Sequence, residues 1–448
     1  MVAIVLDDLR TDFAKNFIDK VQRSSEDEES YYLFFARHRE WEDDSVPDLP
    51  VDNRAAYHAV FPEILAATRI SSEMVVQAIP RNNWESGTVY DIYRHDYDAD
   101  NQTIEGESSL YDANFYVVNS ELNVYKCIDN NNGAESTVEP TGTSTNIQTL
   151  GDEYRWKFMY GLTSLQALNF VAPDFLIVKT VDGDDGTGQL EVQEAAVDGA
   201  IDHIAVDSPG SGYSEGDTVI VTGTGSGCTA EVESVDSEGG ILKVLVTESG
   251  EGYFYAEAEV DGSSEGTGAT LTPIIPPPGG HGANAVYELG GHNVYINVTV
   301  TGAEGDGDFP INNDFRVLGI VHNLKNKDGE IASNETLDFT NTLTLSDVSD
   351  DILPEDTFEG QDSNAQGRAL TYESGDQVLR YTQTVDQRKN DFQEGEIVQF
   401  DSGSTATIDS IEERDVQEFS GYPLYIENRR PIVRTSDQQE DISIILTL

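Results

Sequence analysis

Acidic side chains at regular spacing are the first candidates for chemistry in this chain. Asp96, Asp98, Asp100 and Glu107 occupy relative positions 1, 3, 5 and 12, which is the spacing of carboxylate ligands in an EF-hand calcium loop. However, position 6 is Asn101 where that loop requires glycine, and the flanking segments have strand patterns rather than helical ones. Two interpretations therefore stay open: a site for a cation such as calcium, sodium or potassium, or a solvated acidic hairpin. No motif indicates an organic cofactor.

Two further catalytic patterns lack the context that their chemistry needs. Gly212–Gly216 fits the G-x-S-x-G nucleophile pattern, but it lies in a glycine-rich stretch without a strand–turn–helix context. The seven histidines include no pair at metal-ligand spacing. We expect the glycines around His281 to allow a tight turn and His281 to form a local hydrogen bond. The sequence therefore predicts a protein that is not an enzyme.

The net charge is the most unusual feature of the composition. Acidic residues number 83 against 26 basic ones, which gives a charge of −57, and the nine lysines are fewer than the seventeen arginines. Self-repulsion of this size destabilises a compact chain in dilute salt, whereas at molar salt a Debye length of about 3 Å screens it. We favour adaptation to a high-salt cytoplasm over an acidic surface matched to a basic partner, because the acids are spread along the whole chain. Binding to nucleic acid is not expected, because no basic stripe could neutralise phosphates.

Cysteine content and hydropathy indicate where the chain is made. Cys127 and Cys228 fall in different predicted domains, so we expect reduced, packed thiols rather than a disulfide. No apolar run approaches 18 residues, and the N-terminus lacks the basic start of a signal peptide. We therefore expect no membrane insertion, and a chain that stays in the cytoplasm until it is assembled.

Strand patterns dominate the elements that must position these residues. A helical pattern occurs near the N-terminus, capped by Thr11 or Asp12, and Asp347–Gly367 is expected to be an acidic loop. The fold class predicted is mainly β or α+β, with several domains: a β-sandwich-like core, short N-terminal helices and an inserted glycine-rich β-repeat module. We place the core at residues 1–181 and 276–448 and the module at residues 182–275.

An internal repeat defines the inserted module. The Gly-Tyr pair at Gly212-Tyr213 recurs 40 positions later at Gly252-Tyr253, and the glycine-rich Gly225–Thr229 recurs 41 positions later at Gly266–Thr270. A strand-rich repeat near 40 residues indicates stacked β units. Insertion of such a unit in an exposed loop costs little, because closure entropy grows slowly with loop length.

The C-terminal region supplies the candidate interface. Ile442–Leu448 alternates in polarity and is expected to pair in a sheet, and a turn is expected at Asn428–Pro431 before it. Arginine can bind carboxylates in bidentate fashion, so cations in this turn are suited to contact an acidic partner. We therefore predict an interface formed by Asn428, Arg429, Arg430 and Pro431. Trp84 and Trp156 are added because tryptophan is enriched at binding hot spots, although burial in the fold is the competing interpretation.

Several segments in the same order resemble one family, the baseplate wedge subunits of contractile-tailed (myovirus-type) phages. The C-terminal Gly421–Leu448, with its ENRRPI run, carries the resemblance most clearly. The other segments are Tyr32–Trp41, Ala78–Trp84, Val124–Pro140, Asp152–Tyr160 and Pro278–Gly291. Together they cover most of residues 1–181 and 276–448.

The resemblance implies a structural virion protein. Its members are non-enzymatic, bind other wedge proteins, form a homodimer within each wedge and assemble in six-fold baseplates that rearrange when the tail contracts. With the acidic composition, this suggests a virus of a halophilic host, with the chain in the host cytoplasm before assembly and in the tail baseplate afterwards. One alternative is a tail-associated protein that binds or depolymerises carbohydrate through the repeat module. A secreted, calcium-dependent adhesin is a further alternative, which would need an export signal.

Overall fold

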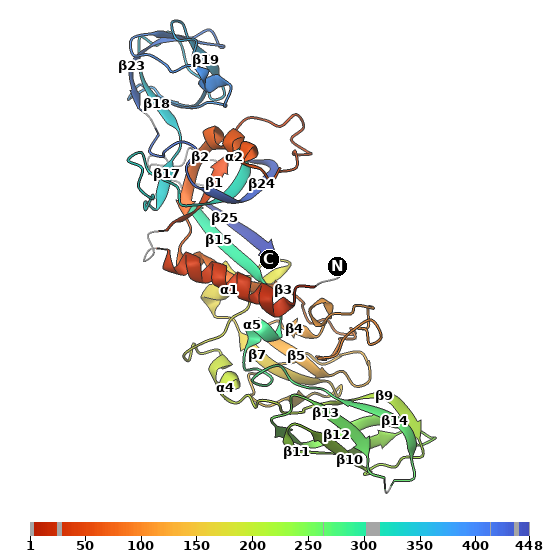
Figure 1. Cartoon of the computed structure of the whole chain (residues 1–448). Coiled ribbons are helices and arrows are strands. Elements are labelled where there is room, and N and C mark those ends of the chain that lie inside the picture. Colours follow the sequence, from red (N-terminus) through yellow and green to blue (C-terminus); the bar gives the residue numbers. More distant parts are fainter. Residues whose placement is uncertain are drawn as a thin grey trace. The chain divides into compact units, whose positions relative to one another are not determined.

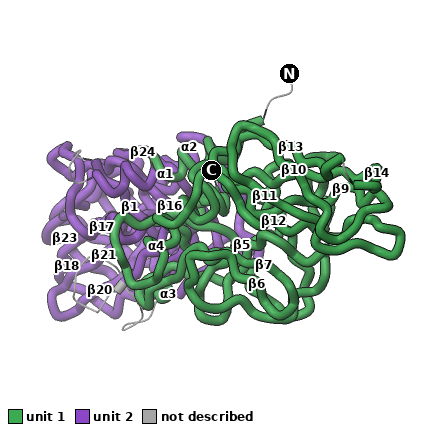
Figure 2. Tube along the Cα trace, turned by 90° about the horizontal axis from the view of Figure 1, so that it is seen from below, with its two compact units in different colours: residues 1–16, 76–295, 445–448 green, residues 17–75, 296–444 purple. Residues whose placement is uncertain are grey.

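The computed structural model describes residues 4–24, 29–262, 264–301, 314–412, 414–433 and 439–447. Strands hold 41% of the residues and helices 12%, so the predicted mainly β fold is confirmed (Figure 1). The chain forms two compact units, coloured separately in Figure 2. Unit 1 contains Met1–Asn16, Val76–Tyr295 and Ile445–Leu448, and unit 2 contains Phe17–Val75 and Ile296–Ile444. The domain limits that we placed at residues 181 and 275 stay a prediction.

An N-terminal helix, α1 (Asp7–Arg23), begins earlier than the expected cap residues. Asp7 and Asp8 lie in its first turn, and Lys20 and Arg23 lie in its last, so charges at both ends oppose the helix dipole favourably. Among the described residues, no helix is long and apolar enough to cross a membrane.

Unit 2 contains a five-stranded sheet in the order β17-β2-β1-β16-β24. The central strand has the sequence YYLFFA, and all six side chains are buried because neighbouring elements cover both faces. Pro62 lies in the short 3₁₀ turn that begins where α2 ends, as expected from the fixed φ angle of proline. The elements are β1 (Tyr31–Ala36), α2 (Arg54–Val60), η1 (Phe61–Glu63), β2 (Ile64–Arg69), η2 (Ser72–Met74), β16 (Asp314–His322), β17 (Thr336–Asp338) and β24 (Tyr422–Val433).

The rest of unit 2 includes a closed six-stranded barrel. Phe358, Phe392 and Phe400 pack in its interior. The expected loop at Asp347–Gly367 is therefore wrong in part, because β19 lies within it and pairs with two neighbours despite having only one large apolar residue. The strands are β18 (Asn341–Ser346), β19 (Thr357–Gly360), β20 (Gln366–Glu373), β21 (Val378–Thr382), β22 (Ile397–Phe400) and β23 (Thr405–Glu412), with η4 (Gln387–Lys389) between β21 and β22.

Unit 1 is built on a sheet in the order β4-β5-β7-β6, with a second sheet formed by residues of β25, β15, β3 and β8. Trp156 and Phe158 lie in the interior of the first sheet's core. The elements are β3 (Val75–Pro80), η3 (Leu110–Asp112), β4 (Tyr116–Val118), β5 (Asn123–Asp129), β6 (Gln148–Thr149), β7 (Arg155–Gly161), α3 (Ser164–Asn169), β8 (Phe175–Ile177), α4 (Gln189–Glu194) and α5 (Ala285–Glu288). Two further strands, β15 (Asn293–Thr301) and β25 (Gln439–Thr447), have residues in both units. The strand expected at Ile442–Leu448 is present as part of β25; Leu448 lies outside the described residues.

The glycine-rich repeat forms a six-stranded antiparallel sheet in the order β12-β11-β10-β13-β14-β9 (Figure 1). Each repeat supplies three strands, and the first strand of each pairs with the last strand of the other. The two middle strands pair at the centre, so the repeats are interwoven rather than stacked. The strands are β9 (Ile204–Ser211), β10 (Thr218–Gly223), β11 (Ser226–Val235), β12 (Ile241–Glu251), β13 (Ala256–Val260) and β14 (Thr267–Pro273).

Candidate interaction surface

Four of the predicted interface residues, Asn428–Pro431, lie in β24, the last strand of the unit 2 sheet. Phe315 pairs with Ile432 and Val317 pairs with Asn428, so the strand bulges outward over the residues between them. The prediction of a turn at Asn428–Pro431 is therefore wrong. Pro431 lies in a β-bulge, where the absence of its N–H group removes no hydrogen bond between the strands. Asp437 and Gln438 of the C-terminal motif lie outside the described residues.

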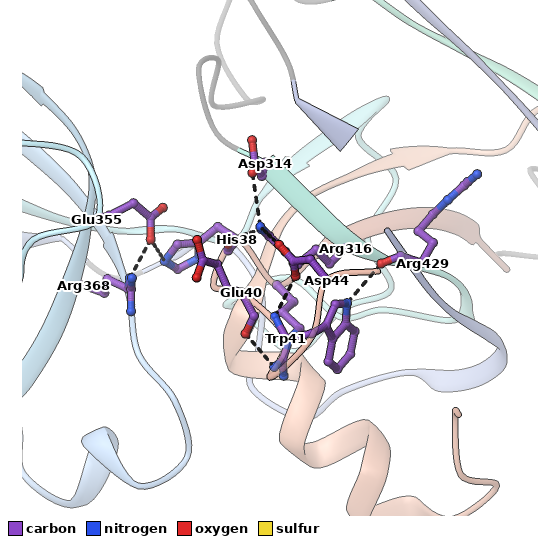
Figure 3. Close-up of polar contacts among 10 residues, drawn as sticks. His38, Glu40, Trp41, Asp44, Asp314, Arg316, Glu355, Arg368 and Arg429 are labelled. Atoms are coloured by element: carbon purple, nitrogen blue, oxygen red, sulfur yellow. Dashed lines mark hydrogen bonds and ion pairs between the residues drawn. The ribbon is translucent and has the colours of Figure 1, made fainter. Parts of the chain in front are cut away.

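An irregular segment, residues 41–53, is attached to this bulged strand. The indole Nε1 of Trp41 donates a hydrogen bond to the Arg429 carbonyl at 3.0 Å (Figure 3). Asn428 Nδ2 donates to the Asp48 carbonyl at 2.8 Å, and Arg430 Nε donates to the Ser45 carbonyl at 3.2 Å. Three residues of the predicted interface thus hold a segment of the same chain.

The side chain of Arg316 holds the start of the 41–53 segment in place. Its Nε and Nη2 donate to the two carboxylate oxygens of Asp44 at 2.9 and 2.7 Å, and its Nη1 donates to the His38 carbonyl at 2.5 Å (Figure 3). The side chain of Arg316 is only 3% exposed, so this bidentate pair is shielded from solvent on the arginine side. Hydrogen bonds from Arg316 and from the Trp41 amide lower the pKa of Asp44 to about 2.

Trp41 is held on a second side by a cation–π contact. The guanidinium of Arg37 lies 3.7 Å from the centre of the Trp41 ring, and the Trp41 amide donates to Asp44 at 2.8 Å. Because the ring, its indole N–H and its backbone are all engaged, the path of the chain after Trp41 is fixed.

His38 is buried beside this cluster and stays neutral. Burial, together with the charges of Arg368 and Arg39, lowers the pKa of His38 to about 3. Its Nε2 lies 3.8 Å from Glu355, which pairs with Arg368 at 2.7 Å (Figure 3). This histidine therefore carries no charge at neutral pH.

Large apolar side chains project from the fixed segment and from the neighbouring strand. Leu49 is 87% exposed, and a surface cavity of about 400 Å³ lies between Pro50–Arg54 and Pro423–Ile426. In the part of the chain that the structure describes, no further strand pairs with the outer side of β24. An exposed sheet edge flanked by apolar side chains is typical of a protein-binding site. We call this the edge surface, formed by Val46, Leu49, Val51, Tyr422 and Leu424.

Of the two tryptophans predicted as interface residues, Trp156 lies in the core of unit 1 and Trp84 is partly buried against that core. Trp156 is 0% exposed and stacks on Tyr154, so it cannot contact a partner in the folded chain. Trp84 packs against the same cluster, and its Nε1 donates to Ser136 Oγ at 3.1 Å. For Trp156 the interface prediction is wrong, because an aromatic residue in a strand can fill a core instead.

Two of the four candidate cation ligands, Asp96 and Asp98, use their carboxylates in other contacts, whereas Asp100 and Glu107 form the cited bonds through their backbone amides. Arg94 donates two hydrogen bonds to Asp96 at 2.9 and 2.8 Å, and Asp98 Oδ1 accepts the amides of Asp100 and Asn101 at 2.8 Å each. Glu107 closes a turn with its amide. Within the described ranges, no group of three or more His, Cys, Asp or Glu side chains is placed to hold a metal ion. Residues 91–109 form turns and bends without paired strands, so the expected hairpin is not present either.

A buried ion pair in unit 1 was not anticipated from the sequence. Lys126 and Glu288 are almost fully buried and bind each other, and Glu288 also accepts the Gly282 amide at 2.9 and 3.0 Å. The tight turn expected around His281 is present, but the expected hydrogen bond is absent for Nδ1, a buried atom without a partner. Lysine inside an otherwise apolar strand was the available signal for this closed pair.

Comparison with known proteins gives no assignment. No protein family and no curated protein matches the chain.

Proposed function

We propose that this chain is a structural virion protein, a baseplate wedge component of a contractile tail from a virus of a halophilic host. The observation that carries the proposal is the edge surface: exposed apolar side chains on a segment fixed by buried contacts, beside an unpaired strand edge. Exposing such a surface on a very acidic chain is costly unless a partner covers it. The ordered resemblance of several segments to wedge subunits supports the same role.

In this role the chain binds neighbouring wedge proteins in the baseplate. A homodimer within each wedge, and six wedges around the hub, would follow the arrangement of the family it resembles. Its role is mechanical. The chain holds neighbouring wedge proteins in one arrangement and allows that arrangement to change when the tail contracts. Assembly takes place in the host cytoplasm, and the finished protein resides in the tail baseplate.

Substitution of Leu49 tests the edge surface directly. In a virus that depends on a supplied copy of this chain, Leu49→Asp should reduce assembled tails at least about tenfold, because a charge placed in an apolar contact opposes binding. Leu168→Asp is the matched control, because Leu168 is 81% exposed in unit 1. Both isolated variants should keep the thermal midpoint of the unaltered chain. Normal tail assembly with Leu49→Asp would refute the role of the edge surface.

A further inference from the structure

The interwoven repeats of the module provide an internal comparison. In each repeat, a tyrosine ring packs on a glycine of the other repeat: a Cβ on Gly266 would lie 2.1 Å from Tyr213, and a Cβ on Gly225 would lie 2.5 Å from Tyr253. Both hydroxyls also accept a backbone N–H at 3.3 Å, from Ala269 and Cys228 respectively. The two tyrosines therefore have the same structural role.

The chain that follows each tyrosine differs between the repeats. In the first repeat it is the polar turn Ser214–Asp217, closed by the Ser214 amide bonding to Asp217 Oδ2 at 3.0 Å. In the second repeat it is Phe254-Tyr255, with side chains 71% and 57% exposed. The first repeat reaches its middle strand without aromatic residues, so the fold does not require them here. The exposure of two large aromatic side chains at consecutive positions calls for another explanation.

The aromatic pair is held in a fixed position by one side chain. Thr224 Oγ1 accepts the amide of Phe254 at 2.8 Å and donates to the Gly252 carbonyl at 3.2 Å. The Thr224 amide in turn donates to the Tyr255 carbonyl at 3.0 Å. A loop fixed in this way loses little conformational entropy when a ligand binds.

A hydrogen-bonding group adjoins the second ring and connects it to a neighbouring cavity that neither ring lines. The Tyr255 hydroxyl donates to the carboxylate of Glu257, and this residue also lines a surface cavity of about 380 Å³. Further lining residues are Thr222, Glu259, Thr272 and Pro273. The exposed aromatic pair is thus linked through Glu257 to a cavity lined by carboxylate and hydroxyl groups.

We propose that Phe254 and Tyr255 form a binding platform for an uncharged glycan chain, with Glu257 as a hydrogen-bond acceptor for sugar hydroxyls. A sugar ring has an apolar C–H face that can stack on an aromatic ring, and its rim of hydroxyls donates to carboxylates. Glu257 and Glu259 disfavour acidic glycans and nucleic acids at this site, because an ionised carboxylate has no hydrogen to donate to another anion. A protein partner would need roughly 800 Å² of surface, and two rings flanked by acids fit a narrower ligand better. This proposal goes beyond the baseplate role and does not depend on it.

A glycan array tests the site with the full chain in molar KCl. The array should carry neutral hexose and N-acetylhexosamine oligomers together with sulfated and uronic acid oligomers. We expect binding to neutral oligomers, and the double variant Phe254→Ala/Tyr255→Ala should bind at least about tenfold more weakly, since two stacking contacts are lost. Glu257→Gln should weaken binding severalfold. Both variants should retain the thermal midpoint, because the rings are exposed.

The first repeat supplies the matched control, Ser214→Ala/Glu215→Ala, which should bind as the unaltered chain does. Equal loss in the control variant would overturn the proposal, as would the absence of binding to any neutral oligomer. Preferential binding to acidic oligomers would also overturn it. If the aromatic double variant binds glycans normally but fails to join purified tails, the rings contact protein and the glycan proposal is wrong.

Discussion

Arg316 and Asp44 form a two-bond ion pair across 272 positions of sequence. The pair joins β16 to the start of the 41–53 segment, and the same segment carries the exposed Leu49 of the edge surface. An arginine in the sheet therefore determines where an exposed apolar side chain is presented. Rigid presentation favours binding because less conformational freedom is lost on association.

Replacement of Arg316 by lysine should release this segment. Lysine cannot reproduce the bidentate geometry, so we expect Arg316→Lys to lower the free energy of unfolding by about 1.5–3 kcal/mol. Limited proteolysis should then cut faster within residues 41–53. Lys327→Ala is the control, because the Lys327–Asp415 pair is exposed and its loss should change stability by less than about 1 kcal/mol. Equal protease resistance of Arg316→Lys and the unaltered chain would contradict the account.

His38 should make folding stability sensitive to mild acid. The unfolded chain binds a proton at the ordinary pKa of 6.5, whereas the folded chain does so only near pKa 3. Between these values the unfolded state binds more protons, so stability falls as the pH falls, by up to about 1.4 kcal/mol per pH unit from this group.

Chemical unfolding between pH 7 and pH 4.5 measures this effect above the range in which Asp44 titrates. Because the pKa of Asp44 is lowered to about 2, its contribution is present above its ordinary pKa of 3.8 and is lost below it. His38→Gln should flatten the pH dependence. The same slope in both chains would show that His38 does not remain neutral in the fold.

Salt should stabilise the isolated chain. The charge of −57 makes the folded state self-repulsive when screening is weak. We expect the thermal midpoint to fall steadily as KCl is diluted from about 3 M to about 0.2 M, as the Debye length grows. Circular dichroism during heating measures this, with a neutral protein of similar size as the control. A midpoint that is constant or higher at low salt would contradict adaptation to a high-salt cytoplasm.

The spacing of residues in the sequence predicted much of the fold, but it did not predict the details of the proposed interface. The repeat offsets near 40 positions predicted a β module, because both copies use the same glycine-tyrosine geometry. The interweaving of the repeats could not be predicted, since stacked and exchanged pairing have the same sequence period. Pro431 suggested a turn because proline interrupts strands, but a bulge satisfies the same constraint. Trp156 illustrates that residue type alone does not distinguish a core from an interface.

Particle composition tests the central proposal most directly. Quantitative mass spectrometry of purified virions should find this chain in a copy number that is a multiple of six, as the six-fold symmetry of a baseplate requires. Electron microscopy of the same particles should place it at the end of the tail. If the chain occurs only in infected-cell lysate and never in purified particles, it is not a structural component of the baseplate.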